Sequence, residues 1–155
     1  MVERSDPARA GVKAGRVVGL LTAGLAVVSL LRIQGPFYAD TTVLLGMIGI
    51  ESGRSVLAIF WWNVLVAAVV RYTIGYIVGS LIGVLYDWLD HPPSSVLVGI
   101  VLVVVVGDGL LEGIDTRNAL VGGAYVIAWL CYVPVFYWIY DPEAGDDRSG
   151  PLRLS

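Results

Sequence analysis

Long runs of uncharged, apolar residues recur along this 155-residue chain and constrain its fold more than any other feature. Hydrophobic residues make up 57% of the sequence and charged residues only 15%. A soluble domain of this length has no core large enough to bury so many apolar side chains. Several of the runs are long enough, as helices, to cross a bilayer. The pattern therefore predicts an all-α integral membrane protein, a four-span transmembrane helix bundle, and argues against a soluble enzyme or a nucleic-acid binder.

The runs place the four spans at about 17–34, 55–88, 95–113 and 118–140, between a basic segment, 1–16, and an acidic tail, 141–155, that we expect to be mobile. The first run is also similar to a secretory signal peptide. Because Arg32 follows it where a small-residue cleavage signal is expected, we interpret it as a retained span ended by Gly35-Pro36. The third run is rich in valine, and a helix is favoured because a lone strand leaves its backbone unsatisfied in lipid.

Two segments do not fit a simple span. Residues 41–52 are predicted to form a short interfacial or re-entrant helix capped by Asp40, because their uncharged part covers only about 15 Å as helix. Residues 55–86, by contrast, extend over about 48 Å as helix. A steep tilt, a kink near Arg71, or packing of the first part (60–63) against neighbours at the interface would each accommodate that length, and the sequence does not choose among them.

Turn and aromatic signals mark the ends of the spans. The segment His91-Pro92-Pro93-Ser94-Ser95 predicts a tight helical hairpin, in which the prolines end one helix and a serine caps the next. Pro134 predicts a kink in the fourth span. Aromatic residues near the span ends are expected at the membrane interface, where amphipathic rings are enriched; they are Trp61, Trp62, Phe136, Tyr137, Trp138 and Tyr140.

The distribution of cations predicts the topology. With four spans and the N-terminus inside, six Lys and Arg residues lie on the inner side, and three lie on the outer side: Arg32, Arg54 and Arg117. The positive-inside rule favours this arrangement, with both termini cytoplasmic. A fifth crossing by residues 41–52 would also divide the cations six to three, so span length rather than charge favours four spans.

Glycines recur every four residues in two rows, which are Gly75, Gly79 and Gly83 in the second span and Gly11, Gly15 and Gly19 leading into the first. Residues four apart share a helix face, and the missing side chains let another backbone approach closely in lipid. The rows therefore predict two helix-packing faces of the glycine-zipper type. They pack either within the chain, against each other or the third span, or between copies of the chain.

Three charged residues lie inside the predicted spans: Arg71 in the second, and Asp108 and Glu112, one turn apart, in the third. A charge in lipid is costly unless it is paired or faces water. Arg71 and Glu112 are equally distant from the hairpin turn, so an antiparallel pair of helices brings them to the same depth. The spacing predicts an intramembrane charge cluster, which is either a structural ion pair or part of a cation or proton path.

Signals of enzymatic or cofactor chemistry are lacking. Cys131 is the only cysteine and His91 the only histidine, which excludes an internal disulfide, a Cys/His zinc site and a bis-histidine haem. Tyr86-Asp87 and Gly107-Asp108 resemble the acid motifs of intramembrane aspartyl proteases, but Val105 interrupts the second motif and the two carboxylates differ in depth by roughly 16 Å. We expect a non-enzymatic protein with no cofactor and no metal.

Two functions fit these features. The first is a small assembly or scaffold subunit whose glycine-rich faces join it to itself or to a larger membrane complex. The alternative is a small ion or proton channel or transporter that uses Arg71, Asp108 and Glu112. A cluster closed beneath Tyr72 and Tyr76 favours the first function, and an aqueous vestibule beside the cluster favours the second. The expected partners are the lipid bilayer and membrane proteins rather than nucleic acid.

Overall fold

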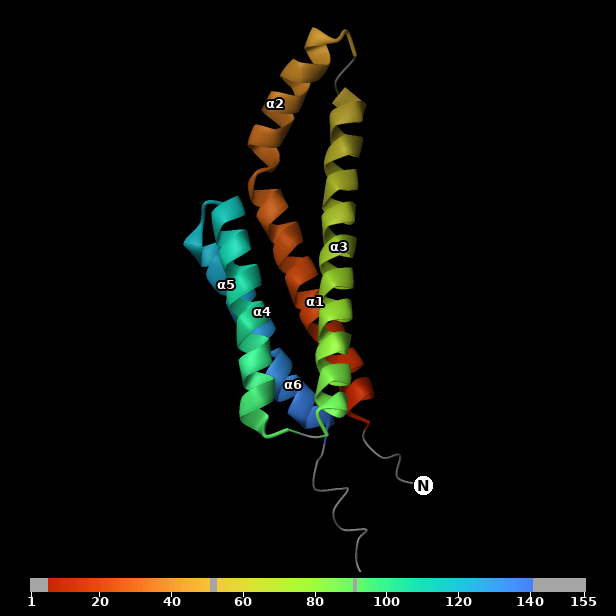
Figure 1. Ribbon diagram of the computed structural model, residues 1–155. Helices are drawn as coiled ribbons and strands as arrows, with labels where there is room; N and C mark the ends of the chain where they lie inside the picture. Colours follow the sequence, from red (N-terminus) through yellow and green to blue (C-terminus); the bar gives the residue numbers. More distant parts are fainter. Residues whose placement is uncertain (1–5, 51–52, 91, 141–155) are drawn as a thin grey trace, which may run out of the picture.

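The computed structural model describes residues 6–50, 53–90 and 92–140. These residues form helices and no strand (Figure 1): α1 (Pro7–Arg32), α2 (Gln34–Met47), α3 (Gly53–Trp88), α4 (Ser94–Asp115), α5 (Ala119–Leu130) and α6 (Tyr132–Ile139). Four segments are long and apolar enough to cross a membrane, namely α1, α3, α4, and α5 together with α6. The chain is therefore an all-α, multi-pass membrane protein, and the predicted fold class is confirmed.

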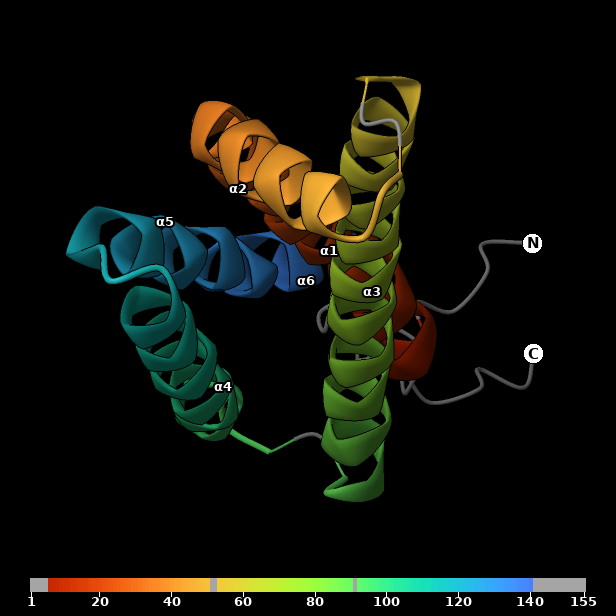
Figure 2. The ribbon, with the colours of Figure 1, turned by 90° about the horizontal axis from the view of Figure 1, so that it is seen from above.

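Helix α1 lies at the centre of the bundle (Figure 2). It contacts α2, α3, α5 and α6, and its longest contact is with the antiparallel α3. Helix α4 packs mainly against α5 and diverges from α3, although α3 and α4 are neighbours in the sequence. A side chain that joins α3 to α4 must therefore be long.

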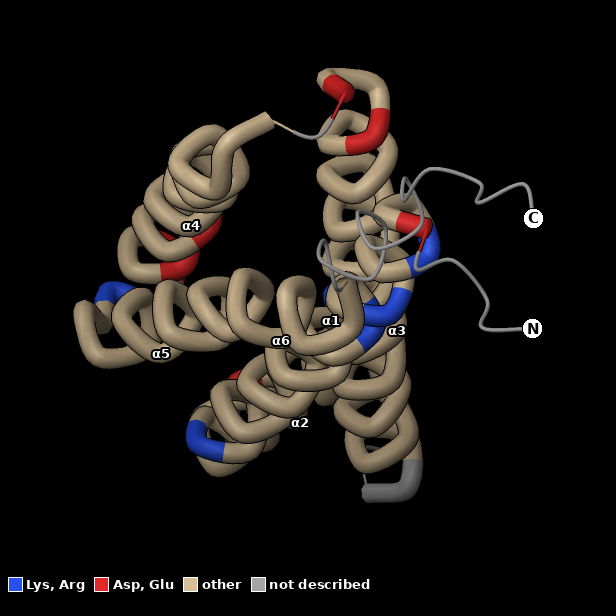
Figure 3. The backbone as a smooth tube through the Cα atoms, turned by 90° about the horizontal axis from the view of Figure 1, so that it is seen from below, with Lys and Arg blue, Asp and Glu red and all other residues tan. Residues whose placement is uncertain are grey.

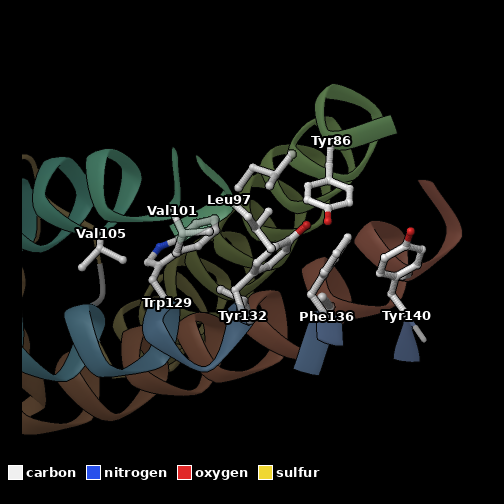
Figure 4. Packing of buried hydrophobic residues seen from close by; sticks show 12 residues of the cluster. Tyr86, Leu97, Val101, Val105, Trp129, Tyr132, Phe136 and Tyr140 are labelled. Atoms are coloured by element: carbon white, nitrogen blue, oxygen red, sulfur yellow. The ribbon is translucent and has the colours of Figure 1, made fainter. Parts of the chain in front are cut away.

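The buried core lies toward the end of the bundle where α1 begins and α6 ends (Figure 4). Tyr132 and Phe136 of α6 are fully buried there, and the Tyr132 hydroxyl donates a hydrogen bond to the Gly79 carbonyl oxygen at 2.7 Å. The Phe136 ring lies 5.3 Å from the Tyr86 ring and 5.6 Å from the Tyr140 ring, centroid to centroid. The edge-to-face contact between Phe136 and Tyr86 ties α6 to α3.

This core corrects the predicted aromatic belt. Phe136 and Tyr140 are buried rather than interfacial, whereas Trp138 is 87% exposed. The reason is the helical period: Phe136 and Tyr140 are four residues apart and share the face that packs against the bundle, whereas Trp138 lies on the opposite face. On α3, Trp61 and Trp62 are exposed, as an interfacial position requires.

Helix α1 begins ten residues before the predicted first span. The Asp6 side chain caps it by accepting a hydrogen bond from the Ala8 N–H at 2.9 Å, and Pro7 occupies its first turn. The basic segment is therefore helical from Pro7 onward, and the small residues Ala10 and Ala14 in it are buried. The helix ends at Arg32, close to the predicted end.

Helix α2 begins at Gln34, so the predicted start at Asp40 is wrong and Asp40 lies inside the helix. The chain bends at Ile33, and Gly35 and Pro36 fall in the first turn of α2 rather than after a helix end. Proline is tolerated in a first turn because its missing N–H has no partner to lose there. The predicted end of this helix, residues 51–52, lies outside the described residues.

Helix α3 accommodates the overlong apolar segment as one continuous helix of 36 residues, about 54 Å long. Figure 1 shows α3 as a straight helix along its length, without the kink that was one alternative. Its first part packs against α2, since the Phe60 ring lies 5.4 Å from Phe37 and 5.3 Å from Tyr38. The first part of α3 thus packs against a neighbour, as one alternative expected, and the tilt of the helix in the membrane stays a prediction.

The two other turns differ in their capping. Helix α4 begins at Ser94 after Pro93, with no side-chain cap, so the predicted serine cap is wrong; His91 lies outside the described residues. Asn118 caps α5 by accepting a hydrogen bond from the Leu120 N–H at 3.0 Å. The fourth span breaks at Cys131, three residues before Pro134. A proline clashes with the carbonyl four residues earlier, so the predicted kink is confirmed and placed.

Candidate functional site

Arg71 of α3 reaches across the gap to α4 and pairs with both predicted acids. Its Nη1 donates to Asp108 Oδ1 at 2.7 Å, and its Nη2 pairs with Glu112 Oε1. The three side chains are only 20%, 17% and 13% exposed, respectively. The structure thus brings together the three charged residues that the sequence places inside the spans.

Two aromatic residues of α5 complete this cluster. The Trp129 indole N–H donates to Asp108 Oδ2 at 2.8 Å, and the Arg71 guanidinium carbon lies 4.8 Å from the centre of the Tyr125 ring. Both aromatic side chains are fully buried. Asp108 therefore has one donor on each oxygen, and Arg71 has two carboxylates and a ring face around its guanidinium.

Tyr125 and Trp129 were not predicted from the sequence. They lie four residues apart in an apolar helix, and this spacing puts two aromatic side chains with polar tips on one face. This spacing is the signal in the sequence that could have identified the two residues, although it does not show that Arg71 and Asp108 are their partners. The expected cover, Tyr72 and Tyr76, lies elsewhere: Tyr72 contacts the backbone at Gly19, and Tyr76 lies under Arg16 at 5.8 Å.

A cavity of about 560 Å³ opens beside the cluster at the end of the bundle where α4 turns into α5. Arg71 and Glu112 line its inner end, and Arg32 and Asp115 lie at its exposed rim. The other lining residues are Ala26, Ser29, Leu30, Ile33, Ala67, Val70, Thr116, Asn118, Val121 and Tyr125. On the side of the cluster away from the cavity, the buried side chains of Val101, Val105 and Trp129 fill the space between the helices.

The two glycine rows face each other along α1 and α3. A Cβ atom built on Gly75 would lie 2.5 Å from the Gly19 Cα atom, and one on Gly11 would lie 2.5 Å from the Gly83 Cα atom; Gly15 and Gly79 meet in the same way. The two backbones are in contact, so a methyl group on any of these glycines displaces a backbone. Each glycine row is therefore packed against the other row of the same chain.

The other sequence candidates are not part of this site. Asp87 lies in the last turn of α3, about 24 Å along the helix from Arg71, so it does not meet Asp108 as a protease pair would require. Cys131 is a half-buried free thiol. The described residues contain no group of three or more His, Cys, Asp or Glu side chains placed to bind a metal ion.

No protein-family model, curated protein or solved structure matches the chain. The function is therefore inferred from the geometry of the fold and of this cluster.

Proposed function

We propose that this protein is a non-enzymatic subunit of the cell membrane, with both termini cytoplasmic, that assembles with a second copy of itself. The observation that supports the proposal is an apolar arm that projects beyond the bundle. We define the α2–α3 arm as α2 together with residues 55–61 of α3. Figure 1 shows it extending past the turn between α4 and α5.

The depth of the protein in the membrane follows from its tryptophans. Trp61 and Trp62 are exposed near one end of the bundle, and Trp88 and Trp138 at the other. The part of α3 between Trp62 and Trp88 is about 39 Å long, close to the thickness of a bilayer with its headgroups. This placement supports an arm that lies outside the hydrocarbon core.

The basic residues support the orientation. Arg9, Lys13 and Arg16 lie in the first half of α1, at the same end of the bundle as Trp88 and Trp138, and Figure 3 views the molecule from this end. The positive-inside rule makes this end cytoplasmic. The arm is then on the outer side.

An apolar arm outside the core requires a partner. No residue of α2 is buried, and Leu44, Met47 and Ile48 are 63%, 77% and 68% exposed. A helix of this length is unstable in water without packing, and an apolar face of this kind marks an interaction surface. Because a second copy in the same membrane presents its arm at the same height, two arms can bury one another symmetrically as four helices.

The contact between the two copies lies at the tip of the arm. Asp40 is the charged residue within α2 and lies nearer the bundle, so the apolar residues Val43, Leu44 and Met47 are available beyond it. Assembly through the glycine rows, the route first expected from the sequence, would require α1 and α3 to separate.

Disulfide cross-linking in native membranes tests the proposal. In a Cys131→Ser background, Met47→Cys should give a covalent dimer upon mild oxidation. The matched control is Val103→Cys on α4, which is 75% exposed compared with 77% for Met47 but lies on the bundle. A monomer with both variants, or equal dimer with both, would reject assembly through the arm.

The cavity beside Arg71 favours a second candidate, a small ion or proton transporter. The cavity that opens beside the cluster supports this function, because an ion path needs an opening that leads to the charged residues. The core side chains that pack on the side of the cluster away from the cavity support a binding site that is closed toward the cytoplasmic end, rather than an open channel. Flux of protons or monovalent ions in liposomes, lost with Arg71→Leu, would support the transporter over the assembly subunit.

A further inference from the structure

The charge cluster beside the cavity has a charge balance that assembly through the arm does not use. Arg71 and Glu112 line the cavity with one charge of each sign, and Asp108 lies behind them and adds a second negative charge, so the cluster as a whole carries one negative charge in excess. At the exposed rim, Arg32 and Asp115 offset each other. An excess carboxylate inside a bundle is costly unless a proton or a cation accompanies it.

Glu112 is the carboxylate that a bound molecule would meet. Asp108 accepts from Arg71 with one oxygen and from Trp129 with the other, and it does not line the cavity. Glu112 lines the cavity and is joined to Arg71 through Oε1. The cavity wall therefore holds the Glu112 carboxylate next to the Arg71 guanidinium, and the excess negative charge of the cluster lies directly behind and within this wall.

The walls define what kind of cation fits. They are largely apolar, and the volume of about 560 Å³ lies within the range of small-molecule binding sites. A small inorganic ion would have to give up its water to an apolar wall, which is costly. An organic cation with an apolar body loses little hydration and gains contact with the wall.

We propose that this cavity binds a monovalent organic cation with an apolar body. The cationic group lies beside Glu112, and the body lies against Ala67, Val70 and Val121, which line the opposite walls on α3 and α5. The site is independent of the arm, so it stands or falls separately from the proposed assembly.

The charge requirement is tested with two ions of nearly equal size and opposite charge, tetraphenylphosphonium and tetraphenylborate. Binding to the purified full-length protein in detergent is measured by equilibrium dialysis, and binding to protein-free micelles is subtracted. We expect tetraphenylphosphonium to bind at least tenfold more tightly than tetraphenylborate. Equal binding of the two ions would overturn the proposal.

Two variants locate the binding. Glu112→Gln should weaken tetraphenylphosphonium binding at least tenfold, whereas Asp40→Asn, which removes the same charge from the exposed surface of α2, should leave it within twofold. Ala67→Phe fills the cavity without changing charge and should also weaken binding at least tenfold. If Glu112→Gln does not fold, Ala67→Phe decides the location. Unchanged binding in Ala67→Phe would place the cation outside the cavity and reject the site.

Discussion

Arg71 and Asp108 lie 37 residues apart in the chain, yet the arginine Nη1 lies 2.7 Å from the aspartate Oδ1. This ion pair joins α3 and α4 across the gap between them. Trp129 of α5 holds the other oxygen of the same carboxylate, so one side chain of α4 is joined to two other helices. Glu112 shares the same arginine but has no such link to α5 among the described interactions.

The two acids should therefore differ in their effect on stability. Asp108→Asn weakens two hydrogen bonds to a charged group, and we expect it to lower the free energy of unfolding by about 2 kcal/mol. Glu112→Gln leaves Arg71 paired with Asp108 and removes the excess charge, so the change should stay below about 1 kcal/mol. Thermal unfolding of both variants in one detergent measures the difference, and equal losses would contradict the asymmetry.

Glycines on the two sides of the bundle should respond in opposite directions to the same substitution. Gly79→Ala places a methyl group against the backbone of Gly15 and should destabilise by about 1–3 kcal/mol. At Gly99 of α4 an added Cβ meets no atom within 4 Å, so Gly99→Ala should stabilise the helix by about 0.5–1 kcal/mol. The comparison uses chemical or thermal unfolding of the two variants. Tolerance of alanine at Gly79 would mean that α1 and α3 are not in backbone contact.

The turn between α4 and α5 contains a strained residue that a glycine should relieve. Arg117 has a φ of 49°, in the left-handed region where a Cβ atom is unfavourable. Arg117→Gly should raise stability by about 0.5–1 kcal/mol, because the relieved strain of about 1–2 kcal/mol exceeds the cost of about 0.5–1 kcal/mol from the greater freedom of glycine in the unfolded chain. A melting temperature that falls in this variant would show that the arginine side chain has a stabilising contact.

The proposed topology predicts the accessibility of both chain ends. Cysteines placed singly at Ser5 and Ser149, both outside the described residues, in a Cys131→Ser background should resist a membrane-impermeant thiol reagent in intact cells. A cysteine at Met47, in the arm, should react with it. Labelling at only one terminus would exclude an even number of spans.

The number and type of the spans could be predicted from the sequence because they depend on local properties. The length of an apolar run decides whether it can cross the hydrocarbon core, and lipid leaves the backbone no alternative to a helix. The positions of α3 and α4 follow from this with errors of at most two residues at either end. The facing of Arg71 and Glu112 was also predictable, because equal distances from one turn give equal depth in antiparallel helices.

Contacts between distant segments were decided only by the tertiary structure. The apolar pattern of α3 does not say that α2 covers its first part, and the aromatic residues of α6 have the same composition whether they face lipid or the core, so Phe136 and Tyr140 were misplaced. Trp129 meets Asp108 because α5 packs along α4, a choice of helix neighbour that no spacing encodes. In lipid, apolar side chains do not distinguish inside from outside, so the choice of partner depends on close packing and on the few polar groups that must be satisfied.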